Sequence, residues 1–387
     1  MQLLHWWSTL LFALAIPQFA FGEQILLGSP TDPVIPACPP LPPRKSASTS
    51  VHDLRIDDIK VIAALGDSIT AGFAAKGLSN GSEPMPMRST TENRGTSFSM
   101  GGDTGVVSVP NLIRQFQPEL KGYSTGDHIA EICYGLWCVP FQYWPRQDKL
   151  NAAQTGAMVH NLIYELQYLV SAMKMQKDID FEKDFKLLTL FIGSNDVCLG
   201  CSSIPGPAWP SPALFEQTVR ILIGEIRARI PRVVVNVLMQ FNVSQVYDLT
   251  HDDPWCARLR ASGFVFECSC AFLPGAAGPL TRRLMDELVQ SYNSRLQSIR
   301  DDYKTRRYDD FAMMVDPGFS QLEIRNWPLG HVSDVDCFHP GVKAHEAMAV
   351  GVWNNLFLPE KKKHRSIDPN KPLDVFCPGA DSRIRTD

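Results

Sequence analysis

The sequence predicts an α/β fold, a three-layer α/β/α sandwich with a mostly parallel central sheet. Two observations lead to this prediction. Short apolar runs that favour strands alternate along the chain with longer stretches in which apolar residues recur at helical spacing. Such alternation is typical of a parallel sheet with helices on both faces. The chain has 387 residues, of which 44% are hydrophobic, so a large core is expected, and no interior linker divides it.

The expected elements follow one another in strand–helix order. Strands are predicted over residues 60–65, 185–193, 232–241 and 311–317, and helices over residues 154–175, 213–230, 278–303 and 341–357. The first two strands run into Gly66 and Gly193, and the third is rich in β-branched residues. In the first helix, apolar residues recur from Met158 onward at helical spacing. Pro231 follows the second helix, and Pro340 precedes the last one.

The two ends of the chain are expected to lie outside the folded domain. Residues 1–22 combine an apolar run with a small-x-small site and resemble a secretory signal peptide; a signal anchor is the alternative, but the run is short for a membrane span. Residues 23–55 form a leader rich in Pro and Ser, and residues 56–358 form the domain. Residues 359–387 form a polar tail, expected to be tied back by a disulfide.

Ten cysteines agree with a secreted, extracellular protein, because disulfides persist in an oxidising compartment. The pairs Cys133–Cys138 and Cys198–Cys201 would close small loops, and Cys38–Cys377 would join the two ends, but spacing alone does not fix the pairing. Zinc is the alternative for Cys198-x-x-Cys201 and Cys268-x-Cys270. It is disfavoured because no histidine pair has finger-like spacing and secreted chains favour disulfides. The sequence contains no metal cluster, phosphate loop or dinucleotide fingerprint, so no metal and no cofactor are expected.

Charge and sequons restrict the partners further. The net charge of −4 and the absence of a basic stripe argue against a nucleic-acid partner. The run of charges over residues 360–365 is interpreted as a solvated tail. Sequons at Asn80 and Asn242 predict N-glycosylation of an exported surface.

Three loops are expected to meet at one edge of the sheet. Gly66-Asp67-Ser68 follows the first strand, Gly193-Ser194-Asn195-Asp196 follows the second, and Asp336-Cys337-Phe338-His339 precedes the last helix. Carboxyl ends of parallel strands gather functional residues. Alone, Ser68 is more often a helix N-cap, and Asn195 is an ordinary turn residue. Together the loops supply the nucleophile, base, orienting carboxylate and neutral donor that ester hydrolysis requires.

In this order, these motifs resemble those of the GDSL, or SGNH, serine hydrolases, with Ile69 in place of the usual leucine. The longer stretches 93–103, 110–116, 188–201 and 336–349 resemble the phospholipase B branch, and the similarity covers most of residues 55–380. The resemblance implies the flavodoxin-like sandwich of SGNH hydrolases for this chain. It also implies roles for individual residues.

By this resemblance, Ser68 attacks the ester carbonyl, His339 takes the proton, and Asp336 orients His339. The Asn195 amide and the Ser68 N–H donate to the oxyanion. Gly156 is the expected third donor, because its stretch matches the family's second block and is expected to begin a helix with outward-pointing amides.

The third oxyanion donor has an alternative assignment, and the role of Asp67 needs a separate interpretation. Gly101 or Gly102 is the alternative to Gly156 as the third oxyanion donor; otherwise the pair forms a flexible turn. Asp67 adjoins Ser68 but is not the expected triad acid, because a tight turn points it elsewhere.

The resemblance implies a secreted serine esterase that hydrolyses acyl ester bonds of phospholipids and lysophospholipids through an acyl-enzyme. We expect a monomer in transient contact with a membrane or micelle surface. Trp137, Phe141, Tyr143 and Trp144 would form either an acyl-binding wall or a hydrophobic cluster under the loop. The alternatives are another carboxylic-ester hydrolase, such as a general lipase or a carbohydrate acetyl esterase, or a non-catalytic secreted lipid-binding protein.

Overall fold

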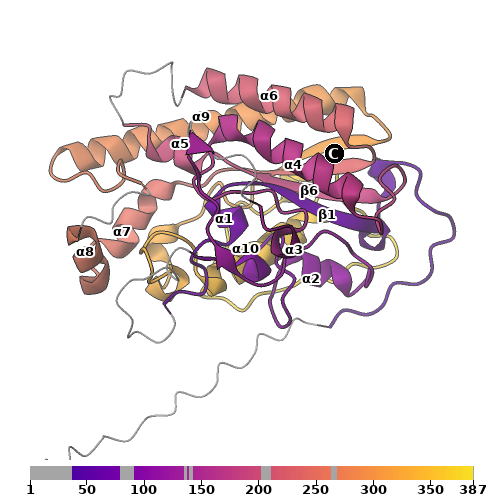
Figure 1. Ribbon diagram of the computed structural model, residues 1–387, viewed down its shortest axis with the longest axis horizontal. Helices are drawn as coiled ribbons and strands as arrows, with labels where there is room; N and C mark the ends of the chain where they lie inside the picture. The colour runs from indigo at the N-terminus through magenta and orange to yellow at the C-terminus, as the bar shows by residue number, and fades with distance from the viewer. Residues whose placement is uncertain are drawn as a thin grey trace, which may run out of the picture. The chain divides into compact units, whose positions relative to one another are not determined.

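A sheet of parallel strands forms the centre of the protein (Figure 1). The computed structural model describes residues 37–78, 91–134, 137–138, 143–201, 211–262 and 268–386. Strand β1 (Ile59–Gly66) pairs with β6 (Phe185–Phe191), β6 with β7 (Val233–Leu238), and β7 with β8 (Phe311–Asp316). Nearly every residue of these strands is buried, as expected for apolar runs covered on both faces.

Helices cover both faces of this sheet, so the predicted three-layer α/β/α sandwich is confirmed. Helices α4 (Leu162–Met175), α6 (Pro212–Arg229) and α9 (Ala277–Arg306) pack on one face, and α2 (Val109–Arg114) and α10 (Val342–Leu356) lie on the other (Figure 1). The short helices are α1 (Ser68–Ala71), α3 (Pro145–Asp148), α5 (Ser194–Cys198), α7 (Val246–Thr250) and α8 (Pro254–Ala261). Small antiparallel pairs join β2 (Thr91–Glu92) to β3 (His128–Ile129) and β4 (Cys133–Tyr134) to β5 (Trp137–Cys138).

The first long helix starts later than the sequence predicts. Helix α4 begins at Leu162, after a 3-10 turn over Val159–Asn161, and not at residue 154. The preceding segment is held beside β1, because Ala152 N donates to the Ala64 carbonyl at 2.9 Å and Gln154 N donates to the Gly66 carbonyl at 3.2 Å. A tertiary contact with the sheet edge therefore overrides the local helical preference.

Residues on both sides of the 56–358 segment pack against the core. Leu54 is fully buried, and its carbonyl accepts a hydrogen bond from the backbone of Ile384, which is also buried. The Cys38–Cys377 disulfide joins the two ends, as expected. The signal-peptide segment 1–22 lies outside the described residues. In the described part of the chain, no helix is both long and apolar enough to span a bilayer.

One expected local disulfide forms and the other does not. Cys133 pairs with Cys138, but Cys198 pairs with Cys268 and Cys201 pairs with Cys270. The Cys198–Cys201 pairing is wrong because the 268–270 segment lies against the end of α5 and supplies a closer partner to each sulfur. All ten cysteines are disulfide-bonded, including the four considered as zinc ligands.

Peptide mapping tests this pairing. Proteolysis without reductant should release the peptide that contains Cys198 and Cys201 covalently joined to the peptide that contains Cys268 and Cys270, because two disulfides connect them. Mass spectrometry before and after reduction measures the joined species. Recovery of a Cys198–Cys201 peptide closed on itself would contradict the structure.

Candidate active site

The turn between β1 and α1 presents Ser68. Asp67 is the N-cap of α1, because its Oδ1 accepts a hydrogen bond from Ile69 N at 3.0 Å, and Ser68 is the first helical residue. The interpretation of Ser68 as the cap is therefore wrong. A side chain at Gly66 would lie 2.5 Å from the Phe191 carbonyl oxygen, so only glycine fits where the strand ends.

Ser68, His339 and Asp336 form one hydrogen-bonded chain. The Ser68 Oγ lies 2.7 Å from His339 Nε2, across 271 residues of sequence. The Nδ1 atom of His339 lies 2.5 Å from Asp336 Oδ2. A carboxylate at Nδ1 fixes the tautomer in which Nε2 accepts the serine proton. The structure thus brings together the three residues that the sequence singles out as nucleophile, base and orienting acid.

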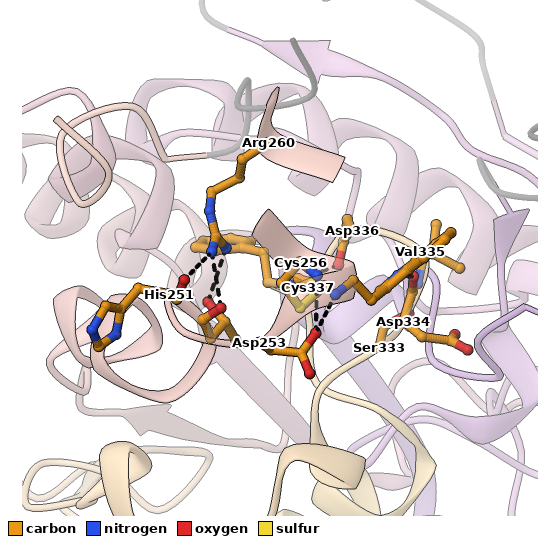
Figure 2. The surroundings of a disulfide bond; sticks show 12 residues. His251, Asp253, Cys256, Arg260, Ser333, Asp334, Val335, Asp336 and Cys337 are labelled. Atoms are coloured by element: carbon orange, nitrogen blue, oxygen red, sulfur yellow. Dashed lines mark hydrogen bonds between the residues drawn. A yellow bond between two sulfur atoms is a disulfide. The ribbon is translucent and has the colours of Figure 1, made fainter. Parts of the chain in front are cut away.

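The Cys256–Cys337 disulfide fixes the loop that carries the acid and the base. Cys337 directly follows Asp336, has a φ of 56°, and is joined to α8 through Cys256 (Figure 2). Helix α8 is itself anchored, because the Asp253 carboxylate accepts from the Cys256 amide at 2.9 Å and Arg260 donates to nearby backbone carbonyls. Sequence reasoning missed this constraint, although the position of Cys337 inside the Asp–His motif was a signal for it.

The three predicted oxyanion donors differ in how their N–H groups are engaged. The Ser68 N–H belongs to the first residue of α1, where helix amides have no intrahelical acceptor. The Asn195 amide donates one N–H to the Ala157 carbonyl at 2.9 Å, which leaves its second N–H for another acceptor. The N–H of Gly156 meets no acceptor among the described residues. Gly156 does not begin a helix, however: it lies in a turn with a φ of 83°.

The alternative glycines are already engaged. Gly101 N donates to the Ser97 carbonyl at 2.7 Å, and Gly102 N donates to the Ser124 carbonyl at 2.8 Å. An N–H that is satisfied by the chain is not available to a developing oxyanion. This difference favours Gly156 as the third donor.

Buried carboxyl groups support the backbone around Ser68. Burial raises the pKa of Asp67 and of Asp196 to about 7, and it raises the pKa of Glu165 well above its ordinary value. Glu165 accepts a hydrogen bond from Gly66 N at 2.9 Å, and Asp196 accepts one from Val159 N at 3.1 Å. These carboxyls therefore fix the strand end and the start of the 3-10 turn. The supporting roles of Glu165 and Asp196 were not apparent from the sequence.

The predicted aromatic wall is only partly described. The Tyr143 ring stacks on Tyr168 with centroids 3.5 Å apart, and its hydroxyl donates to the Ala152 carbonyl. Tyr143 therefore belongs to a packed cluster under the loop. Trp144 is 47% exposed, and Phe141 and the side chain of Trp137 lie outside the described residues.

A separate apolar cavity of about 50 Å³ lies beside the triad. Ile69, which follows the nucleophile, contributes to its wall, as do Phe338 and Pro340 on either side of His339. Ala344 and Met348 of α10 close another side. The wall is almost entirely apolar, so the cavity suits a hydrocarbon group.

One group among the described residues has metal-ligand spacing: His128, Glu131 and Asp148. The guanidinium of Arg94 already lies among them, 3.2 Å from Asp148 and 3.4 Å from Glu131. A cation is therefore present in this cluster without a metal ion.

Known proteins share the sequence pattern of this chain. A family model described as GDSL-like Lipase/Acylhydrolase matches residues 62–352. "Phospholipase B1, membrane-associated" of Rattus norvegicus is 31% identical over 355 residues, which cover 89% of this chain and 23% of that protein. The protein of the same name from Mus musculus is 32% identical over 356 residues, 88% of this chain and 22% of that protein. The chain thus spans less than a quarter of the length of the curated relatives it matches.

A solved structure of an acetyl xylan esterase from Geobacillus stearothermophilus is also similar. It aligns with a TM-score of 0.37 and 14% identity, covering 77% of this chain and 95% of that chain.

The buried carboxyl of Asp67 predicts a pH dependence of stability. Its ordinary pKa is 3.8, whereas the folded group titrates near 7. Between these values the folded protein binds more protons than the unfolded chain, so the free energy of unfolding falls as the pH rises. Asp67→Asn keeps a capping side chain but cannot ionise. The stability of this variant relative to the wild type should therefore increase from about pH 4 to about pH 7.

Urea denaturation of the two proteins across this pH range measures the difference. A difference in unfolding free energy that stays constant with pH would show that Asp67 does not titrate as described.

Proposed function

The chain belongs to the GDSL-like lipase/acylhydrolase family, and from this premise we propose that it is a secreted serine esterase that hydrolyses acyl ester bonds of phospholipids and lysophospholipids. The observation that carries the proposal is the hydrogen-bonded chain from Ser68 through His339 to Asp336, at the edge of the sheet where donors for an oxyanion also gather. A hydroxyl aligned with such a base is the arrangement used in acyl transfer.

The proposal gives each step of the reaction to a residue. Ser68 Oγ attacks the ester carbonyl while His339 Nε2 takes its proton, and Asp336 stabilises the imidazolium that forms. The N–H groups of Ser68, Gly156 and Asn195 stabilise the negative oxygen of the tetrahedral intermediate. His339 then protonates the leaving alcohol, which yields the acyl-enzyme. Water attacks the acyl-enzyme by the same route, with His339 again acting as base, and releases the fatty acid.

The apolar cavity beside the triad is proposed to receive the acyl chain. Its wall includes neighbours of both the nucleophile and the base, so a chain held there leaves its carbonyl near Ser68. A single water occupies about 10–15 Å³ on the same measure, so about 50 Å³ admits the first few carbons of an acyl group. This assignment replaces the aromatic wall as the proposed site of acyl binding.

Exposed apolar side chains near Gly156 suit transient contact with a membrane or micelle. Ile129 and Ile132 are 49% and 54% exposed. Trp144 stacks on His128, the neighbour of Ile129, and Ile132 pairs with Thr155, which precedes Gly156. Exposed apolar residues gathered at one site are typical of surfaces that meet lipid or another protein.

Export and glycosylation belong to the same proposal. Disulfide bonding of all ten cysteines suits an oxidising compartment. Asn242 is partly exposed and can accept a glycan, whereas Ser244 of its sequon is buried and donates to Asp286 at 2.5 Å. Asn80 lies outside the described residues. We further propose that the protein acts as a monomer without a cofactor.

Replacement of the nucleophile tests the activity. Ser68→Ala should lower the hydrolysis of lysophosphatidylcholine by about 10⁶-fold and abolish labelling by a fluorophosphonate, because both need the serine hydroxyl. Fatty-acid release and labelling are measured on secreted, folded protein. Labelling with preferential release of acetate from acetylated xylan would redirect the proposal to a carbohydrate esterase. A wild-type protein that neither labels nor hydrolyses any ester would favour the lipid-binding alternative.

Filling the cavity tests acyl binding. Ala344→Leu adds carbons from α10 into the cavity, so the kcat/KM ratio of p-nitrophenyl octanoate to p-nitrophenyl acetate should fall at least about 10-fold, since each methylene that an apolar pocket no longer accepts is worth about that much. Ala347→Leu, on the same helix but outside the cavity wall, is the matched control. An unchanged ratio in Ala344→Leu would remove the cavity from the proposal.

A further inference from the structure

A buried ionic cluster surrounds Arg94, outside the catalytic triad. The Arg94 side chain is fully buried, and its Nη2 donates to Glu92 Oε2 at 2.6 Å. Its Nε lies 3.2 Å from Asp148 Oδ1, which is also 2.7 Å from His128 Nε2. Glu131 completes the group at 3.4 Å. These residues come from β2, β3, α3 and the turns between them, so one side chain joins segments spread over more than 50 residues.

The cluster sets one guanidinium, that of Arg94, among three buried carboxyl groups. Burial raises the pKa of Glu131, so this carboxyl is neutral near pH 7. The guanidinium then faces the carboxyl groups of Glu92 and Asp148, and it donates hydrogen bonds to Glu92 and to the Asn151 carbonyl. A buried arginine without such partners would be strongly destabilising, so the whole set is fixed in one arrangement.

The cluster is connected to the loop of residues 151–156. Arg94 Nη1 donates to the Asn151 carbonyl at 3.1 Å, and Asn151 Nδ2 donates to the Thr70 carbonyl of α1 at 3.0 Å. At the other end of the loop, Thr155 Oγ1 donates to Glu92 Oε1 at 2.5 Å. Thr155 directly precedes Gly156, and α1 begins with Ser68.

We propose that Arg94 and Glu92 are positioning residues for ester hydrolysis: through Asn151 and Thr155 they hold the 151–156 loop so that the Gly156 N–H faces the oxyanion formed at Ser68. This inference rests on the proposed esterase function. It goes beyond that function because the described hydrogen bonds and ion pairs of the cluster join it to the loop and not to the triad. Gly156 has a positive φ in a turn that the Ala157 N–H closes on the Gln154 carbonyl at 3.1 Å, so the direction of its N–H depends on how this turn is held by its neighbours.

Thr155 offers the mildest test, because substitution of the buried Arg94 would leave carboxyl groups unpaired and unfold the protein. Thr155→Val keeps the shape and removes only the hydroxyl, while Glu92 Oε1 keeps its bond from Glu131 N. A displaced oxyanion donor weakens transition-state binding alone, so kcat should fall about 10- to 100-fold with KM nearly unchanged. Thr155→Ser restores the hydroxyl and should recover most of kcat.

Activities are expressed per fluorophosphonate-labelled site on p-nitrophenyl acetate, so that unfolded protein does not count. Lys186→Met is the matched control: its buried ammonium donates to three carbonyls at the opposite end of the sheet. It should lower the melting temperature without changing kcat per labelled site.

The outcomes separate the inference from the proposed function. A wild type that hydrolyses and labels establishes the esterase. The inference is then overturned if Thr155→Val retains the wild-type kcat, if Thr155→Ser loses as much as Thr155→Val, or if the loss lies in KM alone. A wild type without activity or labelling overturns the proposed function itself.

Discussion

The site depends on the tight turn that joins β1 to α1. The strand must end within contact of β6, and only a residue without a side chain allows this approach, because a Cβ at Gly66 would lie 2.5 Å from the Phe191 carbonyl oxygen. Asp67 then caps the helix by accepting from Ile69 N, and Glu165 accepts the Gly66 N–H, so the backbone on both sides of Ser68 is fixed by a buried carboxyl group. The nucleophile Ser68 is presented at the rim by constraints that do not involve the hydroxyl itself.

Burial of polar groups is the cost of this arrangement, and the protein offsets it in two ways. Around the turn, burial raises the pKa of Asp67 and Asp196 to about 7, so these carboxyl groups are largely neutral below pH 7 and less isolated charge is buried. Beside the loop of residues 151–156, the charge of Arg94 is buried but paired, because its guanidinium lies against Glu92 and Asp148. The neutral groups accept backbone N–H bonds, whereas the charged cluster joins distant segments.

Sequence patterns predicted what local periodicity and strand ends determine. The strands and the long helices were found, and so were Ser68 and the Asp336–His339 pair, because parallel strands place their carboxyl ends together. The start of α4 was missed, since hydrogen bonds to β1 hold Ala152 and Gln154 outside the helix and a 3-10 turn precedes Leu162, and the local sequence carries no signal for these tertiary contacts. The same limit applies to the disulfides, whose pairing is a property of packing and not of spacing.

The regular sandwich alone does not bring together the catalytic groups. Only Ser68 and Asn195 start from the ends of sheet strands, while His339 and Gly156 stand on loops. Catalytic geometry tolerates displacements of about 0.5 Å, which free loops exceed. Each loop therefore has its own constraint. Beside His339 it is the disulfide of Cys337, and beside Gly156 it is the hydrogen bond from Thr155 to Glu92 of the Arg94 cluster. The disulfide beside His339 persists only where disulfides are stable. The geometry of the site therefore requires the oxidising compartment that is proposed for the protein.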